Sequence, residues 1–132
     1  MNHYSFEILG NPVPQGRPRA YRRGKLIGVY DPKNSREWKN YVKTKLSFCE
    51  NKPVTPIDTA IKVRMIFYFL KPKSKPKKVV SHTVRPDLSN CIKAIEDAMN
   101  GIIYTDDSRI ISLLAEKYYG ERPGVKIDVW RI

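Results

Sequence analysis

The stretch RPDLSNCIKAIEDAMNGIIYTDD, residues 85–107, sets the expectations for the rest of the chain. Pro86 disfavours a helical conformation for the residue before it, and Asp87 or Ser89 then offers a side-chain oxygen that can cap a helix. The pair Asn100-Gly101 supplies a left-handed stop at the other end. Between these signals, apolar residues recur at helical spacing and predict a buried stripe of Leu88, Cys91, Ile92, Ile95 and Met99.

Polar side chains of the same stretch fall on another face of the predicted helix. Asn90, Lys93 and Asp97 lie three and four residues apart, so they are neighbours on that face. Asp106 and Asp107 follow after a short strand or turn. Such a gathering of carboxylates needs an explanation, because the chain carries 25 Lys and Arg against 13 Asp and Glu, a formal charge of +12.

Length and composition predict one globular domain over residues 1–132, with 41% hydrophobic and 29% charged residues. No apolar run approaches the ~20 residues of a membrane span, and the start lacks a signal-peptide pattern, so we expect a cytoplasmic protein with no membrane partner. Cys49 and Cys91 have apolar neighbours and predict reduced thiols. With His3 and His82 they make no zinc spacing, although His82 alone could titrate near a substrate or serve the core.

The apolar patterns predict an α+β fold, a mixed β-sheet covered by two main helices. Strands are expected at 4–8, 26–30, 59–70, 110–119 and 125–132. The strand at 59–70 should be central in the sheet, because its second half is apolar on both faces. A helix should begin at a capping box made by Asn34 and Glu37 and run to about Glu50, with Trp38 in the core.

Two segments concentrate positive charge and favour a polyanionic partner, in the first place nucleic acid. The prolines and glycines of residues 13–25, VPQGRPRAYRRGK, exclude a regular helix and leave two interpretations. One is an arm whose guanidinium groups meet phosphates while Tyr21 packs on a base or sugar; the other is a solvated loop. Residues 71–78, KPKSKPKK, likewise predict a flexible basic loop, either bound to phosphates or solvated. The candidate DNA-binding residues are Arg17, Arg19, Arg22, Arg23, Lys71, Lys73, Lys75 and Lys77.

The acidic positions suggest a Mg²⁺ site, since carboxylate oxygens and waters suit this ion. Asp87, Asp97 and the Asp106-Asp107 pair could meet at one place, where bound metal would activate a water and neutralise charge on a phosphodiester. Lys93 could steady the phosphate. Structural alternatives remain open: Asp87 as a cap, Lys93 and Asp97 as a surface pair, and Asp106-Asp107 as a turn. Acids inside a basic DNA-facing surface would weaken binding, which favours the metal interpretation.

Three blocks resemble the signature of RusA-type Holliday-junction resolvases, which reads Pro-Asp-x-Asp-Asn-x-x-Lys, then Asp-Ala-Leu-Asn-Gly, then Asp-Asp-Ser. The blocks are RPDLSNCIK at 85–93, EDAMNG at 96–101 and YTDDS at 104–108. Residues 12–18, PVPQGRP, and 117–120, KYYG, are similar to the family as well. The resemblance implies a RusA-like dimeric fold and a Mg²⁺-dependent endodeoxyribonuclease that nicks opposing strands of a four-way DNA junction. Such enzymes act in DNA recombination and repair and are often carried by phages and prophages.

Carried over residue by residue, the resemblance assigns catalysis to three positions. Asp87 matches the first motif Asp, Lys93 the motif Lys, and Asp107 the second Asp of the later pair, with Asp87 and Asp107 expected to bind the metal. Ser89 stands where the motif has its second Asp, so the metal site loses one charge.

The serine at position 89 leaves several outcomes open. Glu96, Asp97 or Asp106 would compensate as an acidic neighbour of the metal; otherwise the enzyme cuts slowly, or the chain is a DNA-junction binding module that has lost cleavage. An RNA-binding or RNA-cleaving protein is a third interpretation. A homodimer would present two equal sites to a junction of approximate two-fold symmetry.

Overall fold

Four strands form a mixed sheet in the order β1-β6-β4-β5 in the computed structural model, which describes residues 2–16, 19–30 and 32–132, with backbone alone at 19, 29 and 30. β4 pairs with β5 in parallel and with β6 antiparallel, and β1 pairs antiparallel with β6. The strands are β1 (His3–Leu9), β4 (Ile61–Leu70), β5 (Ile110–Gly120) and β6 (Gly124–Arg131). The predicted α+β fold with a mixed sheet and two helices is therefore confirmed, and β4 is internal as expected.

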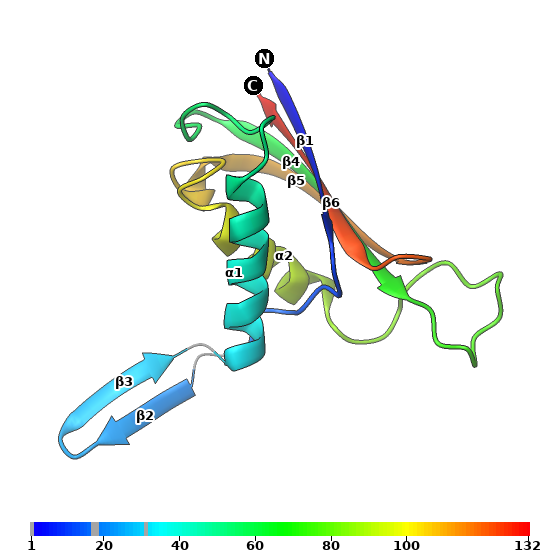
Figure 1. The fold of residues 1–132 in the computed structure, drawn as a ribbon, viewed down its shortest axis with the longest axis horizontal. Helices are drawn as coiled ribbons and strands as arrows, with labels where there is room; N and C mark the ends of the chain where they lie inside the picture. The colour runs from blue at the N-terminus through cyan, green and yellow to red at the C-terminus, as the bar shows by residue number, and fades with distance from the viewer. Residues whose placement is uncertain (1, 17–18, 31) are drawn as a thin grey trace.

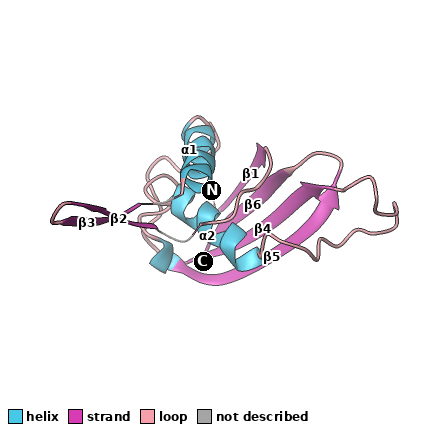
Figure 2. Ribbon diagram, turned by 90° about the horizontal axis from the view of Figure 1, so that it is seen from below, coloured by secondary structure: helices cyan, strands magenta, loops and turns pink. Residues whose placement is uncertain are grey.

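Both helices, α1 (Lys33–Ser47) and α2 (Leu88–Met99), lie against the same face of the sheet (Figures 1 and 2). The alternation of β4 sends Val63, Met65 and Phe67 to the helix side, where all three are fully buried. Cys91 and Ile95 of α2 join this core, as the apolar stripe predicts. Neither of the helices in the described part of the chain lies against the opposite face of the sheet (Figures 1 and 2).

The start of α1 differs from the sequence prediction. The helix has Pro32 at its N-cap and contains Asn34, so the capping box of Asn34 and Glu37 is wrong. Ser35, which is buried, donates a hydrogen bond from Oγ to the carbonyl of Pro32 at 3.0 Å. This turn places Trp38 in the core, 6% exposed, as expected.

The basic segment after β1 is a hairpin rather than an irregular arm or loop. β2 (Arg19–Arg23) and β3 (Leu26–Tyr30) pair antiparallel around the two-residue turn at Gly24 and Lys25. Gly24 has φ +58°, and glycine at the first central position suits a type II′ hairpin turn. The hairpin projects away from the sheet and helices, beside the start of α1 (Figures 1 and 2).

The connection between β4 and α2 extends on the other side of the molecule from the hairpin (Figure 1). Its last part returns along β5, where the amide of Tyr119 donates to the Val80 carbonyl at 2.8 Å. His82 is 6% exposed and stacks on Phe69 with ring centroids 4.1 Å apart. Burial lowers the pKa of His82, with Lys117 adding to the effect, so this histidine serves the core.

Cys49 and Cys91 are both free thiols, as predicted. Within the described ranges, neither helix is long and apolar enough to cross a lipid bilayer.

Candidate active site

Asp87 occupies the N-cap position of α2 in an extended conformation, φ −67° and ψ 142°. Of the two candidate caps, Asp87 and Ser89, Asp87 holds the N-cap position, but its side chain makes no capping hydrogen bond. The carboxylate is exposed at the N-terminal end of the helix. Ser89 is exposed in the first turn of the same helix.

Asp87 borders an open depression of about 640 Å³ that is lined by Pro14, Arg85, Pro86, Asp87 and Asn90. The amide of Gln15 donates to the Asn90 carbonyl at 2.9 Å and fastens the N-terminal segment to α2. The chain leading to the hairpin and the chain returning from the 71–78 loop therefore meet at this depression.

Lys117 of β5 fixes the approach to Asp87. Its ammonium donates to the carbonyl of Val84 at 2.6 Å and to that of Pro86 at 2.8 Å. Both acceptors lie within three residues of Asp87, so the strand holds the backbone from which this carboxylate extends. Lys117 entered the sequence analysis only as part of the family resemblance, because nothing local shows what a strand lysine touches.

Lys93 joins two carboxylates from different elements. Its ammonium lies 3.1 Å from Oδ1 of Asp97, one turn further along α2, and 3.4 Å from Oδ2 of Asp107. The hydrogen bond to Asp97 is the main cause that raises the pKa of Lys93. The predicted i, i+4 pair is thus present, and Asp107 belongs to the same cluster.

Two further charged residues surround this cluster. Lys39 of α1 approaches Oδ2 of Asp97 at 3.7 Å with a side chain that is only 15% exposed. Burial, followed by the negative charge of Asp107, raises the pKa of Glu96, the residue before Asp97. Lys93, Asp97 and Asp107 form what we call the charge cluster, with Lys39 and Glu96 at its edges.

The segment that carries Asp107 is held by buried and polar contacts. Tyr104 is fully buried and donates a hydrogen bond from its hydroxyl to the Glu96 carbonyl at 2.7 Å. Gly101, with φ +82°, makes the turn that brings the chain back, and its amide donates to the Tyr104 carbonyl at 2.8 Å. This return places η1 (Asp107–Arg109) beside α2.

Asp58 also stabilises the segment that carries Asp107, through hydrogen bonds to Thr105 and Arg109. Its Oδ1 accepts hydrogen bonds from Thr105 Oγ1 at 2.6 Å and from Arg109 Nη2 at 2.8 Å, on either side of Asp107. The hydrogen bond from Thr105 is the first cause that lowers the pKa of Asp58, and Arg109 adds to it. The sequence analysis missed Asp58, whose position after Pro56-Ile57 carries no local signal.

Asp106 has a local role. Its Oδ2 accepts a hydrogen bond from the backbone amide of Ser108 at 3.0 Å and caps η1, and hydrogen bonding to Ser108 lowers its pKa. This is the turn role that the sequence left open for the Asp106-Asp107 pair. Asp107 is free of that role, and its carboxylate is directed to Lys93.

The described residues contain no group of three or more His, Cys, Asp and Glu side chains close enough to hold a metal ion by themselves. Mg²⁺ differs from Zn²⁺ in this respect, because it commonly binds one or two carboxylates and completes its shell with waters and phosphate oxygens. Asp87 lies six residues before Lys93, which corresponds to roughly 9 Å along the axis of α2 at the rise of an α-helix. The exposed Asp87 and the half-buried Asp107 carboxylate are donors of the kind such an ion accepts.

The candidate DNA-binding residues occupy the two projecting segments. Arg22 and Arg23 lie on the hairpin, Arg17 lies outside the described residues, and Arg19 is described only by its backbone in β2. In the 71–78 loop, Lys73 and Lys77 are exposed.

Two loop lysines make contacts of their own. The ammonium of Lys71 donates to the carbonyls of Pro76 at 3.1 Å and Lys77 at 2.7 Å, which closes the loop. Lys75 lies 6.0 Å from the ring centroid of Tyr119. These two side chains shape the loop as well as adding charge.

A cleft between α1 and α2 adds basic residues that the sequence analysis did not single out. Arg36, Lys39 and Lys43 line it from α1, opposite Asp97. Their spacing of three and four residues is a helical-face signal, but the apolar face of this helix dominated the interpretation. The charge cluster is therefore bordered by positive charge on its α1 side.

Fold and site together define a small basic α+β protein with a carboxylate–lysine cluster on α2 and η1 and with two cationic projections. The family model described as Endodeoxyribonuclease RusA matches residues 10–130. The chain belongs to the RusA family, as the sequence motifs indicate.

Two relatives match over nearly the whole chain. An uncharacterized protein of Bacillus subtilis (strain 168), YqaN, is 34% identical over 98% of this chain and 96% of its own length. The crossover junction endodeoxyribonuclease rusA of Lactococcus phage r1t is 28% identical over 98% of this chain and 97% of its own length.

Proposed function

We propose that this protein is a Mg²⁺-dependent endodeoxyribonuclease that resolves four-way DNA junctions by paired nicks. Family membership and the full-length similarity to a phage crossover junction endodeoxyribonuclease support a nuclease. The observation that carries the proposal is the charge cluster, in which Asp107 and Asp97 flank Lys93 on a chain of formal charge +12. A surface built only to hold DNA would gain from losing these carboxylates.

We assign the metal to Asp87 and Asp107, with Ser89 and Asp97 in supporting roles. When bound, Mg²⁺ would activate a water for attack and neutralise negative charge on the phosphate. Lys93 contributes a positive charge to the phosphate oxygens, and Asp97 keeps that ammonium in place at 3.1 Å. Asp106 caps η1 and orients its neighbour Asp107, so we assign it a structural contribution to the site.

Ser89 makes the site less negative than the family motif, since a hydroxyl replaces a carboxylate. Asp97 does not restore that charge at the metal, because Lys93 and Lys39 both lie within 4 Å of it. Glu96 is the remaining acidic neighbour. Because its pKa is raised, Glu96 accepts a proton more readily than an exposed glutamate does. We therefore expect weaker metal binding than a site with an aspartate at position 89 would show.

In this proposal, the β2–β3 hairpin and the 71–78 loop contact the phosphate backbone of the DNA. Arg17, Arg19, Arg22 and Arg23 contact phosphates from the hairpin side, and Lys71, Lys73, Lys75 and Lys77 from the loop side. If about 6–10 phosphates are neutralised, affinity should fall by roughly 10³–10⁵ between 50 and 200 mM salt. A homodimer completes the proposal, because a two-fold pair of chains offers one site to each of two opposing strands.

A labelled four-way junction incubated with the purified protein and Mg²⁺ tests the proposal. Paired nicks by the wild type that disappear in Asp87→Asn and in Asp107→Asn, but persist in Glu50→Gln, would support it. Glu50 is exposed just after α1 and provides a control that loses one charge outside the charge cluster. A wild type that binds the junction and yields no product at any Mg²⁺ concentration would refute cleavage.

Ser89 favours a second candidate function, a DNA-junction binding module that no longer cleaves. The same assay separates the two, since the module predicts tight binding without product and restoration of nicking by Ser89→Asp. The enzyme predicts product from the wild type, and a lower Mg²⁺ requirement in Ser89→Asp.

A further inference from the structure

The tip of the β2–β3 hairpin exposes large apolar side chains together with arginines. Leu26 is 59% exposed, Ile27 is 72% exposed and Tyr21 is 39% exposed. Isolated two-stranded hairpins are marginal in water, and exposed apolar side chains on such an element indicate a binding surface.

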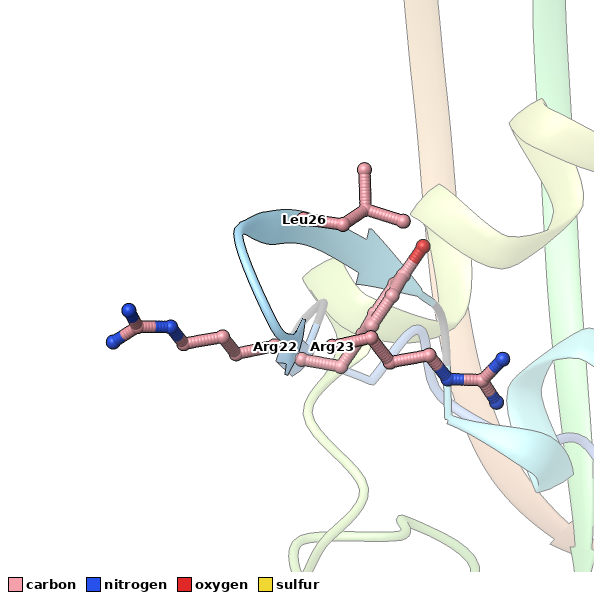
Figure 3. A pocket seen from close by; sticks show the side chains of 4 residues that line it. Arg22, Arg23 and Leu26 are labelled. Carbon is pink, nitrogen blue, oxygen red and sulfur yellow. The ribbon is translucent and has the colours of Figure 1, made fainter.

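Strand pairing distributes these side chains over both faces of the hairpin. Arg23 faces Leu26 across the strands, Arg22 faces Ile27, and Tyr21 faces Gly28. Because side chains alternate along a strand, Leu26 and Arg23 share one face while Ile27 and Arg22 share the other. Figure 3 shows Arg22 and Arg23 extending to opposite sides of the hairpin, with Leu26 beside its end.

Gly28 leaves room for an aromatic ring on the first of these faces. A Cβ atom at this position would come within 2.4 Å of the Tyr21 ring, so the ring lies directly across the glycine backbone. The hairpin therefore carries Tyr21 and Leu26 on one face and Ile27 on the other.

The positive charge of the hairpin segment indicates which kind of partner it binds. Residues 11–30 contain five Lys and Arg and no Asp or Glu. The same surface on a second copy of the chain would repel it, whereas a polyphosphate backbone attracts it. Aliphatic side chains that enter between base steps, flanked by arginines on phosphates, are a known way for proteins to hold distorted DNA.

We propose that the hairpin tip is a wedge that enters among the unstacked bases at the branch point of a DNA junction. Leu26 and Ile27 contact base faces, and Arg22 and Arg23 contact the phosphates on the two sides of the wedge. The inference rests on the proposed function, since it takes branched DNA as the substrate. Bases at a branch point need less unstacking than bases within a duplex, so the wedge favours junctions over linear DNA.

Binding measured without cleavage, in EDTA, tests the wedge with junctions that carry 2-aminopurine at the branch point. The wild type should raise the fluorescence of the probe. Leu26→Ala combined with Ile27→Ala should abolish that rise and reduce the preference for junction over duplex by about tenfold or more. The slope of log affinity against log salt should not change, because no phosphate contact is lost.

Three variants act as controls. Leu26→Met with Ile27→Val keeps the apolar tip and should behave as the wild type. Phe48→Ala removes another exposed apolar side chain, 82% exposed, and should leave fluorescence and preference unchanged. Arg22→Gln with Arg23→Gln should lower the salt slope by about two, close to 0.9 for each phosphate contact.

The outcomes separate the wedge from the function on which it rests. Normal junction binding with a silent probe, or unchanged preference in the Leu26→Ala and Ile27→Ala variant, would overturn the wedge alone. A fall in molecular mass of that variant to the monomer would also overturn it, since the tip would then be a subunit contact. Failure of the wild type to bind junctions would overturn both proposals.

Discussion

Replacing Lys117 by Met tests how strongly β5 holds the segment before Asp87. The substitution keeps a similar unbranched side chain and removes the ammonium that donates to the Val84 and Pro86 carbonyls. Hydrogen bonds from a charged donor contribute about 1.5–3 kcal/mol each. Val84 is 48% exposed, so water can replace the lost donor there, and we expect a total loss near 2 kcal/mol.

That loss converts into a measurable change in melting temperature. An unfolding entropy of about 2.1 cal/mol/K per residue gives roughly 0.28 kcal/mol/K for 132 residues. The Tm of Lys117→Met should therefore fall by about 7 °C, as followed by circular dichroism. Lys126→Met is the matched control, because Lys126 is an exposed lysine of β6, a strand of the same sheet that does not pair with β5. The Tm of this variant should move by no more than about 1 °C.

Lys117→Met should also impair nicking, in addition to lowering stability. Well below the Tm, Lys117→Met should require more Mg²⁺ for nicking, since the backbone that carries Asp87 is no longer fixed. Lys117→Arg keeps a cationic donor and should recover part of both effects. Equal Tm values for Lys117→Met and Lys126→Met, or an unchanged Mg²⁺ requirement, would refute the positioning role of Lys117.

Three further predictions concern the framework of the site. Tyr104→Phe removes a buried hydroxyl and should lower the free energy of unfolding by about 1–2 kcal/mol in urea; an unchanged midpoint would contradict the role of its hydrogen bond. Burial raises the pKa of Cys91 to about 11, so a thiol reagent at pH 8 should modify the half-exposed Cys49 first and Cys91 only after unfolding. The lowered pKa of Asp58 stabilises the fold above its unfolded value of 3.8, and this contribution is lost as the pH falls through the lower folded value. Asp58→Asn should therefore reduce stability at pH 6 and flatten its decline below pH 4; parallel curves would refute the contact.

Local patterns predicted most of the framework. The alternation of Tyr4, Phe6 and Ile8 and the apolar stripe of α2 are properties of neighbouring residues, and both elements lie where the sequence indicates. The ion pair of Lys93 with Asp97 follows from spacing alone. These features need no knowledge of the tertiary structure.

The contacts that complete the site come from distant parts of the chain. Asp58 and Arg109 are 51 residues apart, and Lys117 lies 31 residues from Pro86, so only the folded chain brings each pair together. The hairpin was missed at β2 because its arginines interrupt the apolar alternation that signals a strand. There, the glycine turn and the pairing with β3 determine the conformation.

The assignment of a divalent ion to Asp87 and Asp107 is the central claim, and binding of Mn²⁺ to the protein–junction complex, followed by electron paramagnetic resonance, tests it most directly. We predict bound Mn²⁺ in the wild type and in Glu50→Gln, and at least a tenfold weaker affinity in Asp87→Asn and in Asp107→Asn. Equal Mn²⁺ binding in all four proteins would contradict the claim.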